Sequence, residues 1–191
     1  MNVQSLPLIG IPESTAAPTA APADLRAALE RHHADSLGWA MACCGFDRSE
    51  AGDVLQDSYL KVLDGRAVYR GDSTFRTWLF GVIRRTAGEH RRNVVRRIAR
   101  LWRVQHEVDV NREAPDPDAT IDGRAVALRL REALRQLPAR QRQVLHLVFQ
   151  EGLAVEAAAG VMGCSVGSAR THYARGKARL RELLTERGSR A

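Results

Sequence analysis

The sequence predicts an all-α protein: two small helical bundle domains joined by a flexible acidic linker, with a helix-turn-helix in the C-terminal domain. Three observations lead to this prediction. Apolar residues recur at helical spacing from residue 24 to residue 103 and again from residue 123. The residues between these stretches are rich in carboxylates and include two prolines. Near the C-terminus a Gly-Cys pair separates two helical patterns, which is typical of a tight turn between helices.

The charge balance indicates a polyanionic partner. The 191 residues include 29 Lys and Arg against 22 Asp and Glu, a net charge of +7. Only Lys61 and Lys177 are lysines. Arginine binds phosphate in a bidentate manner, which lysine does not do. An Arg-rich and Ala-rich chain also arises from a GC-rich genome, so both explanations stay open. The hydrophobic fraction of 45% is enough for a core.

Several classes of protein are disfavoured. The three cysteines are an odd number, and Cys43 and Cys44 are adjacent, which argues against a disulfide framework and fits a reducing cytoplasm. No stretch reaches the roughly 18 apolar residues of a membrane span. Residues 1–23 are rich in Pro, Ala, Ser and Thr, which predicts a flexible N-terminal tail and not a signal peptide. The expected location is cytoplasmic.

The N-terminal domain is expected at residues 24–103. Asp24 is a suitable N-cap for a first helix that ends at Gly45. A second helix is expected over residues 48–63, followed by a loop marked by Gly65 and Gly71. The apolar side chains on or near one face of the second helix are Val54, Leu55, Tyr59, Leu60, Val62 and Leu63.

A third helix opens at Phe75 with Ser73 or Thr74 as its cap. Its first half is apolar, and Phe75 and Trp78 are expected in the core. Residues 84–103 then carry eight arginines and one carboxylate, Glu89. Charges so dense repel one another unless an anion neutralises them, which predicts contacts with phosphates. The preceding loop, residues 69–74, has a tyrosine, an arginine and short polar side chains that could hold an unstacked base.

The predicted linker covers residues 104–122, and the predicted C-terminal domain covers residues 123–185, with a tail at 186–191. Four helices are expected in this domain, and Leu137-Pro138 and Gly152 end the first two. Ser165 can cap the last helix. The expected inward side chains of the last two helices are Val155, Ala158, Ala159, Met162, Val166, Ala169, Tyr173 and Leu180. The polar and small outward side chains of the last helix suit a DNA major groove, although a solvated basic helix or a partner-binding helix remains an alternative.

Three stretches, in this order, resemble the bacterial RNA polymerase sigma factors of the extracytoplasmic-function subgroup. They are EAGDVLQDSYLKV, YRGDSTFRTWLFGVIRRTAGEHRR and the segment from LRQLPARQRQVL to KARLREL. The resemblance implies a promoter-recognition protein without a catalytic site, metal or cofactor. Its implied partners are core RNA polymerase (the β′ clamp helices and the β flap), promoter DNA (single-stranded at −10, double-stranded at −35) and an anti-sigma factor.

The resemblance also implies roles by position. The residues that would bind core polymerase are Asp53, Gln56, Asp57 and Tyr59. Those that would bind the −10 element are Tyr69, Arg70, Gly71, Asp72, Ser73, Thr74, Arg76, Arg84, Arg85, Arg91 and Arg92. Those that would bind the −35 element are Ser165, Gly167, Ser168, Arg170, Thr171, His172, Arg175, Lys177 and Arg179. The linker would pass through the polymerase. The chain departs from the family at Arg85, where Asn is usual, at Glu89, where Asp is usual, and at Ala154, which replaces a Ser or Thr cap.

Two other functions fit the sequence less well. His32, His33, Cys43 and Cys44 suggest a metal site, but their spacing is not that of zinc ligands, and the usual enzyme motifs are missing. A repressor or activator with a C-terminal helix-turn-helix would explain residues 123–191. It would leave the helix at 48–63 and the arginine segment without a role.

Overall fold

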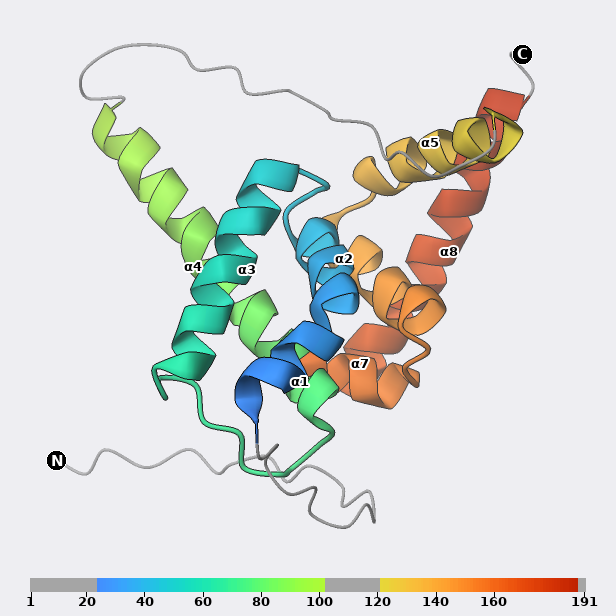
Figure 1. Cartoon of the computed structure of the whole chain (residues 1–191). Coiled ribbons are helices and arrows are strands. Elements are labelled where there is room, and N and C mark those ends of the chain that lie inside the picture. The colour runs from blue at the N-terminus through green and yellow to red at the C-terminus, as the bar shows by residue number, and fades with distance from the viewer. Residues whose placement is uncertain (1–23, 102–120, 189–191) are drawn as a thin grey trace, which may run out of the picture.

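The computed structural model describes residues 24–101 and 121–188, which form helices and the turns between them (Figure 1). No strand occurs in these two ranges, so the all-α prediction is confirmed. The N-terminal tail and residues 104–120 of the predicted linker lie outside the described residues. Helix α5 begins at Ile121, two residues before the expected start of the second domain.

The first bundle consists of α1 (Leu25–Arg31), α2 (His33–Cys43), α3 (Arg48–Leu63) and α4 (Phe75–Leu101). The Asp24 carboxylate accepts hydrogen bonds from the amides of Arg26 and Ala27 at 2.9 and 3.1 Å, so Asp24 is an N-cap as predicted. The expected single helix to Gly45 is interrupted, because His32 has φ −101° and ψ 11°. This bend lets α1 pack against both α2 and α3, a tertiary gain that local periodicity does not report.

Helix α3 has the predicted bounds, and the Asp47 carboxylate caps it by accepting from the Glu50 amide at 2.8 Å. Val54, Leu55 and Val62 are buried as expected. Leu60 and Leu63 are not, since they are 44% and 45% exposed. The periodicity therefore identified the apolar side of α3 correctly but did not distinguish its buried part from its exposed part.

Helix α4 starts at the predicted residue, and Thr74 is its cap: the Thr77 amide donates to Thr74 Oγ1 at 3.2 Å. Phe75 is buried and Trp78 is partly buried. The indole of Trp39 in α2 donates to the carbonyl of Phe80 at 2.9 Å, which fixes α2 against α4. Both residues are fully enclosed, so this bond also satisfies a polar group that burial would otherwise leave without a partner.

The second bundle consists of α5 (Ile121–Arg135), α6 (Ala139–Leu145), the π-helical turn η1 (His146–Gln150), α7 (Val155–Met162) and α8 (Val166–Gly188). Gly152 adopts φ +66° at the point where the sequence predicted a helix end. Ala154 makes no side-chain cap bond to α7, consistent with the missing Ser or Thr. Such a cap is worth about 1 kcal/mol.

The two bundles pack directly against each other. In Figure 1, α7 lies against α4, and α6 lies beside α2. One large core therefore contains Trp39 and Phe80 of the first bundle together with Leu147 and Val161 of the second. A separate core inside the second bundle is small and includes Ala133, Leu137, Leu145 and Leu183. The second bundle thus buries much of its apolar surface against the first.

Candidate nucleic-acid and partner interfaces

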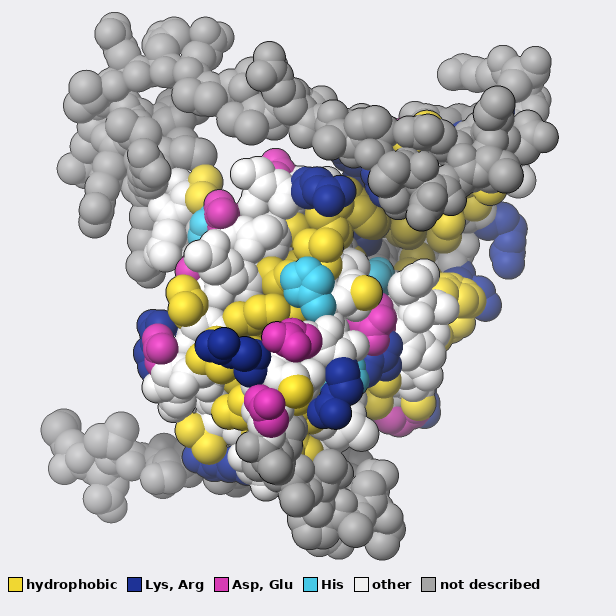
Figure 2. All heavy atoms as spheres, in the orientation of Figure 1, with side chains coloured by type: hydrophobic (Ala, Val, Ile, Leu, Met, Phe, Trp, Pro, Cys, Tyr) yellow, Lys and Arg dark blue, Asp and Glu magenta, His cyan; other side chains and the backbone are white. Residues whose placement is uncertain are grey.

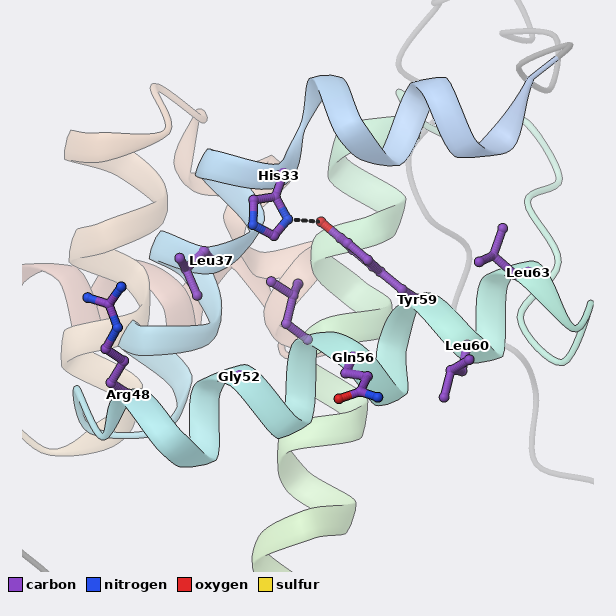
Figure 3. A pocket seen from close by; sticks show the side chains of 9 residues that line it. His33, Leu37, Arg48, Gly52, Gln56, Tyr59, Leu60 and Leu63 are labelled. Carbon is purple, nitrogen blue, oxygen red and sulfur yellow. Dashed lines mark hydrogen bonds between the residues drawn. The ribbon is translucent and has the colours of Figure 1, made fainter.

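A groove of about 440 Å³ crosses the outer face of α2 and α3 (Figure 3). Its lining is largely apolar and consists of His33, Leu37, Arg48, Gly52, Leu55, Gln56, Tyr59, Leu60 and Leu63. The exposed leucines noted above therefore line a groove. Figure 2, which shows this side of the molecule, has hydrophobic side chains gathered across its centre with charged side chains among them. We call this feature the α3 groove.

The predicted polymerase-binding residues divide between the groove and its border. Gln56 and Tyr59 line it, and the Tyr59 hydroxyl lies 3.4 Å from His33 Nδ1. Burial raises the pKa of Tyr59 above its ordinary value, which already lies well above neutral pH. Asp53 and Asp57 are exposed on α3 beside the groove, one helical turn apart. The arrangement offers an apolar strip with carboxylates along its side.

The loop before α4 is held closed by its own tyrosine. The Tyr69 hydroxyl donates to the carbonyl of Ser73, and its ring packs edge-on against Phe75 and Trp78 with centroids 5.6 and 5.3 Å away. Gly71 adopts φ +85°, which only glycine adopts readily. Tyr69 is therefore half-buried, whereas Arg70, Asp72 and Thr74 are exposed. In this state the exposed side chains, and not the tyrosine ring, are available to a ligand.

Arg76 does not share the surface of the other predicted −10 residues. Its Nε donates to Asp35 at 3.0 Å, one Nη donates to the Glu151 carbonyl at 3.1 Å, and the other pairs with the Glu151 carboxylate. The Glu151 carboxylate also accepts a hydrogen bond from His146 Nε2 at 2.8 Å, and its side chain is 3% exposed. The predicted DNA contact of Arg76 therefore requires this cluster between the bundles to open.

Arg84, Arg85, Arg91 and Arg92 lie together along α4, and they line a cleft of about 340 Å³. The opposite wall of the cleft belongs to the second bundle and includes Arg140. Burial and then the charge of Arg140 lower the pKa of the Arg84 guanidinium. These arginines thus form one cationic surface, part of which the second bundle covers.

The helix-turn-helix has the predicted geometry. Gly163 is left-handed at φ +55° and ends α7, and the Ser168 amide donates to Ser165 Oγ at 3.1 Å at the start of α8. Among the inward residues, Ala158, Ala159, Met162 and Ala169 are buried, and the other four are partly buried. The side of α8 that faces water includes Gly167, Ser168, Arg170, Thr171, Arg175, Lys177 and Arg179, with His172 half-exposed.

Two contacts restrain this exposed face. Arg170 pairs with Glu156 of α7 at 2.8 Å, and this hydrogen bond lowers the pKa of Glu156. Lys177 lies over the Tyr173 ring at 5.2 Å from its centroid. Both cations remain exposed, so a nucleic acid could reach them by replacing weak surface contacts. The structure thus places the predicted −35 residues at the start of α8 and around its solvent-exposed sides.

The sequence prediction missed the residues that join the bundles. Arg142 is 7% exposed, and its Nε donates to the carbonyl of Ala42 across the interface at 2.9 Å. Glu151, His146 and Asp35 were missed as well. The position of Arg142 just before the apolar residues Val144 and Leu145 was an available signal, because a buried arginine needs a partner. In the described residues no group of three or more His, Cys, Asp and Glu could hold a metal ion.

A helix-turn-helix together with a cationic helix is typical of DNA-binding proteins that act in transcription. Residues 28–104 match the family description Sigma-70 region 2, and residues 127–180 match Sigma-70, region 4. The chain belongs to the sigma-70 family of RNA polymerase sigma factors, in its extracytoplasmic-function group.

In the part of the chain that the structure describes, no helix is both long enough and apolar enough to span a membrane.

Relatives and solved structures agree with this family. The RNA polymerase sigma-H factor of Pseudomonas aeruginosa is 29% identical over 72% of this chain and 75% of its own. The ECF RNA polymerase sigma factor SigC of Mycobacterium tuberculosis is 28% identical over 73% of this chain and 72% of its own. The fold is similar to that of the sigma factor RpoE in its complex with the anti-sigma factor NepR from Bartonella quintana. That likeness has a TM-score of 0.70 at 23% identity and covers 84% of this chain and 96% of the other.

Proposed function

We propose that this chain directs core RNA polymerase to promoters by dividing three tasks among the surfaces described above. The α3 groove binds the polymerase, the α4 arginines and the 69–74 loop bind the −10 element, and α8 reads the −35 element. The observation that carries this proposal is the combination of a capped, cationic α8 after a left-handed Gly163 with an apolar groove on a separate bundle. A DNA-binding protein acting alone has no need of the groove.

At −35 the chemistry is direct readout. Arginine can donate two hydrogen bonds to guanine O6 and N7, and the Thr171 methyl can contact thymine in a major groove. Ser165 and the free amides at the start of α8 suit a phosphate. Arg170, Thr171 and Arg175 are all exposed on this helix. Lys177 and Arg179 lie further along and would bind the DNA backbone.

At −10 the proposed role is to hold separated strands. Arg84, Arg85, Arg91 and Arg92 would neutralise phosphates, and the exposed side chains of the loop would contact an unstacked base. Because Arg140 and α7 share the cleft with these arginines, the second bundle must move off α4 before a strand can enter fully. Promoter binding is therefore expected to need a separated arrangement of the bundles, which core polymerase would impose.

The α3 groove is the proposed docking site for the β′ clamp helices. A partner helix would place apolar side chains against Leu55, Leu60 and Leu63, and Gln56 would bond to its polar groups. Asp53 and Asp57 would select a partner with positive charge beside its apolar strip. We further propose contact with the β flap by the second bundle, regulation by an anti-sigma factor and action in the bacterial cytoplasm.

The decisive experiment is transcription in vitro with purified core polymerase on fragments of the genome, with mapping of the start sites. The chain is expected to produce start sites that core polymerase alone does not. A gel-shift assay separates this from a self-standing repressor or activator, which would bind duplex promoter DNA tightly without polymerase. Equal initiation with and without the chain at every fragment, together with no association with core, would overturn the proposal.

A further inference from the structure

The cleft between α4 and the second bundle has no counter-charge in its lining. Its walls carry Arg84, Arg85, Arg91 and Arg92 from α4 and Arg140 from α6, and its lining residues in the described chain include no Asp or Glu. We call this feature the inter-bundle cleft. Guanidinium groups at this density repel one another in a partly enclosed space, where water screens them less than at an open surface. The packing of the bundles thus concentrates positive charge.

Arg84 shows the imbalance in detail. Its Nε is buried and has no hydrogen-bond partner in the described structure. Burial and then the charge of Arg140 lower the pKa of its guanidinium, Arg91 lowers it further, and Cys43 and Cys164 act in the opposite direction. A buried N–H of a charged group without an acceptor is costly and rare in folded proteins. An acceptor with negative charge in the cleft would satisfy both the missing hydrogen bond and the repulsion.

The rest of the lining leaves room for such a ligand. Gly81 and Gly88 of α4 line the cleft, as do Gly160 and Gly163 of the second bundle. A Cβ added at Gly88 would contact the Arg92 guanidinium at 3.6 Å, and one added at Gly163 would contact that of Arg84 at 3.5 Å. The glycines therefore keep space around the guanidiniums. The volume of about 340 Å³ falls in the range of small-ligand sites.

These features specify the chemistry of the ligand. An apolar molecule would leave the positive charge of the cleft unneutralised and Arg84 Nε without an acceptor, and a metal cation would be repelled. A single monovalent anion carries only one charge against the five arginines of the lining. An ion with two or three linked phosphate groups offers several acceptor oxygens and enough charge to pair with guanidiniums from both bundles in a bidentate manner.

We propose that the inter-bundle cleft is a binding site for an oligophosphate, such as inorganic triphosphate or the phosphate end of a nucleotide, which bridges Arg84 and Arg140. An occupied cleft holds the second bundle against α4. If the proposed function is correct, the same ligand keeps the α4 arginines from promoter phosphates and so favours the inactive arrangement. The binding site itself does not depend on that function, and neither polymerase nor promoter enters its test.

The test adds sodium tripolyphosphate to the free protein. Titration calorimetry measures binding, and thermal unfolding measures the change in Tm. Saturable binding with a rise in Tm is expected, because a ligand that binds only the folded state stabilises it. Sodium chloride at matched ionic strength should give a smaller and non-saturating change, since it only screens the arginines. Equal responses to the two salts would overturn the proposal.

Variants locate the site. Arg84→Gln and Arg140→Gln, singly, are each expected to weaken tripolyphosphate binding about tenfold or more, since each removes a charge-assisted hydrogen bond. The matched control is the double variant Arg26→Gln/Arg66→Gln, which removes two exposed arginines outside the cleft. Unchanged affinity in Arg140→Gln would refute a bridge between the bundles. An equal loss of tripolyphosphate affinity in the control would show that the effect depends only on the net charge of the protein.

A single substitution can place a negative charge of the protein itself in the inter-bundle cleft. Gly160 lines the cleft, and nothing lies within 4 Å of a Cβ built there. Gly160→Asp should therefore raise Tm relative to Gly160→Asn, which has the same shape without the charge. The aspartate variant should also bind tripolyphosphate at least about tenfold more weakly than the asparagine variant. Identical affinity and Tm in the two variants would contradict the proposal, and this comparison does not depend on removing a structural arginine.

Discussion

Arg76 and Glu151 join the two bundles at two points, because the guanidinium of Arg76 donates both to the backbone carbonyl and to the carboxylate of Glu151. The two residues are 75 positions apart in the sequence. Asp35 and His146 complete the cluster from either side. The carboxylate is almost fully buried, whereas Arg76 keeps contact with water. This pair therefore acts as a polar link at the margin of the shared apolar core.

Glu151→Ala should destabilise the protein, because Arg76 and His146 lose an enclosed partner. We expect a loss of about 2 kcal/mol in the free energy of unfolding, below the range for fully buried pairs because Arg76 is partly solvated. Urea unfolding measures it, and small-angle X-ray scattering should show a larger radius of gyration. Glu156→Ala is the matched control, since its pair with Arg170 is exposed and its loss should leave stability unchanged. Equal stability of both variants with the wild type would show that the link contributes nothing.

The α3 groove gives a second prediction. Asp53→Ala combined with Gln56→Ala should weaken binding to core polymerase about tenfold or more while the helical content stays unchanged, because both side chains are exposed and support no internal contact. Binding to fluorescently labelled core measures the affinity, and circular dichroism checks the fold. Glu30→Ala, which removes an exposed carboxylate of α1, is the control. Normal co-purification of the double variant with core would count against the groove as the docking site.

The exposed face of α8 gives a third prediction. Arg170→Ala and Arg175→Ala should each weaken binding of the holoenzyme to its promoter by about 1–3 kcal/mol if the arginine reads a base. The loss of affinity should occur only at promoters whose −35 element has the base pair that the substituted arginine reads. Arg181→Ala removes an exposed arginine of α8 outside the predicted set and serves as the control. Unchanged transcription with both substitutions would remove α8 from promoter reading.

Salt gives a fourth prediction, which concerns the arginines of α4. The logarithm of the promoter affinity of the holoenzyme should fall linearly with the logarithm of the salt concentration, by about 0.9 per neutralised phosphate. Arg91→Gln combined with Arg92→Gln should reduce this slope by about 2 if each arginine binds one phosphate. A slope that does not change in the variant would assign the phosphate contacts to other residues.

Much of this architecture follows from local sequence signals. Asp24, Thr74 and Ser165 are N-caps as predicted, and α3 has the predicted bounds. Side-chain capping and turn chemistry depend on residues three or four positions apart, so a sequence reports them directly. The predicted outward residues of α8 are exposed or half-exposed, because helical periodicity also depends on such short spacings. Their DNA contacts remain predictions.

Other features depend on contacts between distant segments. Helical periodicity showed that Leu60 is on the apolar side of α3, but it could not show that this position lines an open groove. It likewise could not show that Val161 is buried in the core that the two bundles share. Periodicity identifies the side of a helix that avoids water, whereas the identity of the neighbour is set by the whole fold.

The core that the two bundles share has a consequence for how the protein leaves its closed state. Separation would hydrate Leu147 and Val161, which the first bundle now covers. A free chain with separated bundles would tend to self-associate, because each bundle would expose an apolar patch that is now buried. We therefore expect the closed state to open while a larger assembly binds each bundle, so that the newly exposed apolar surface is covered as the bundles separate.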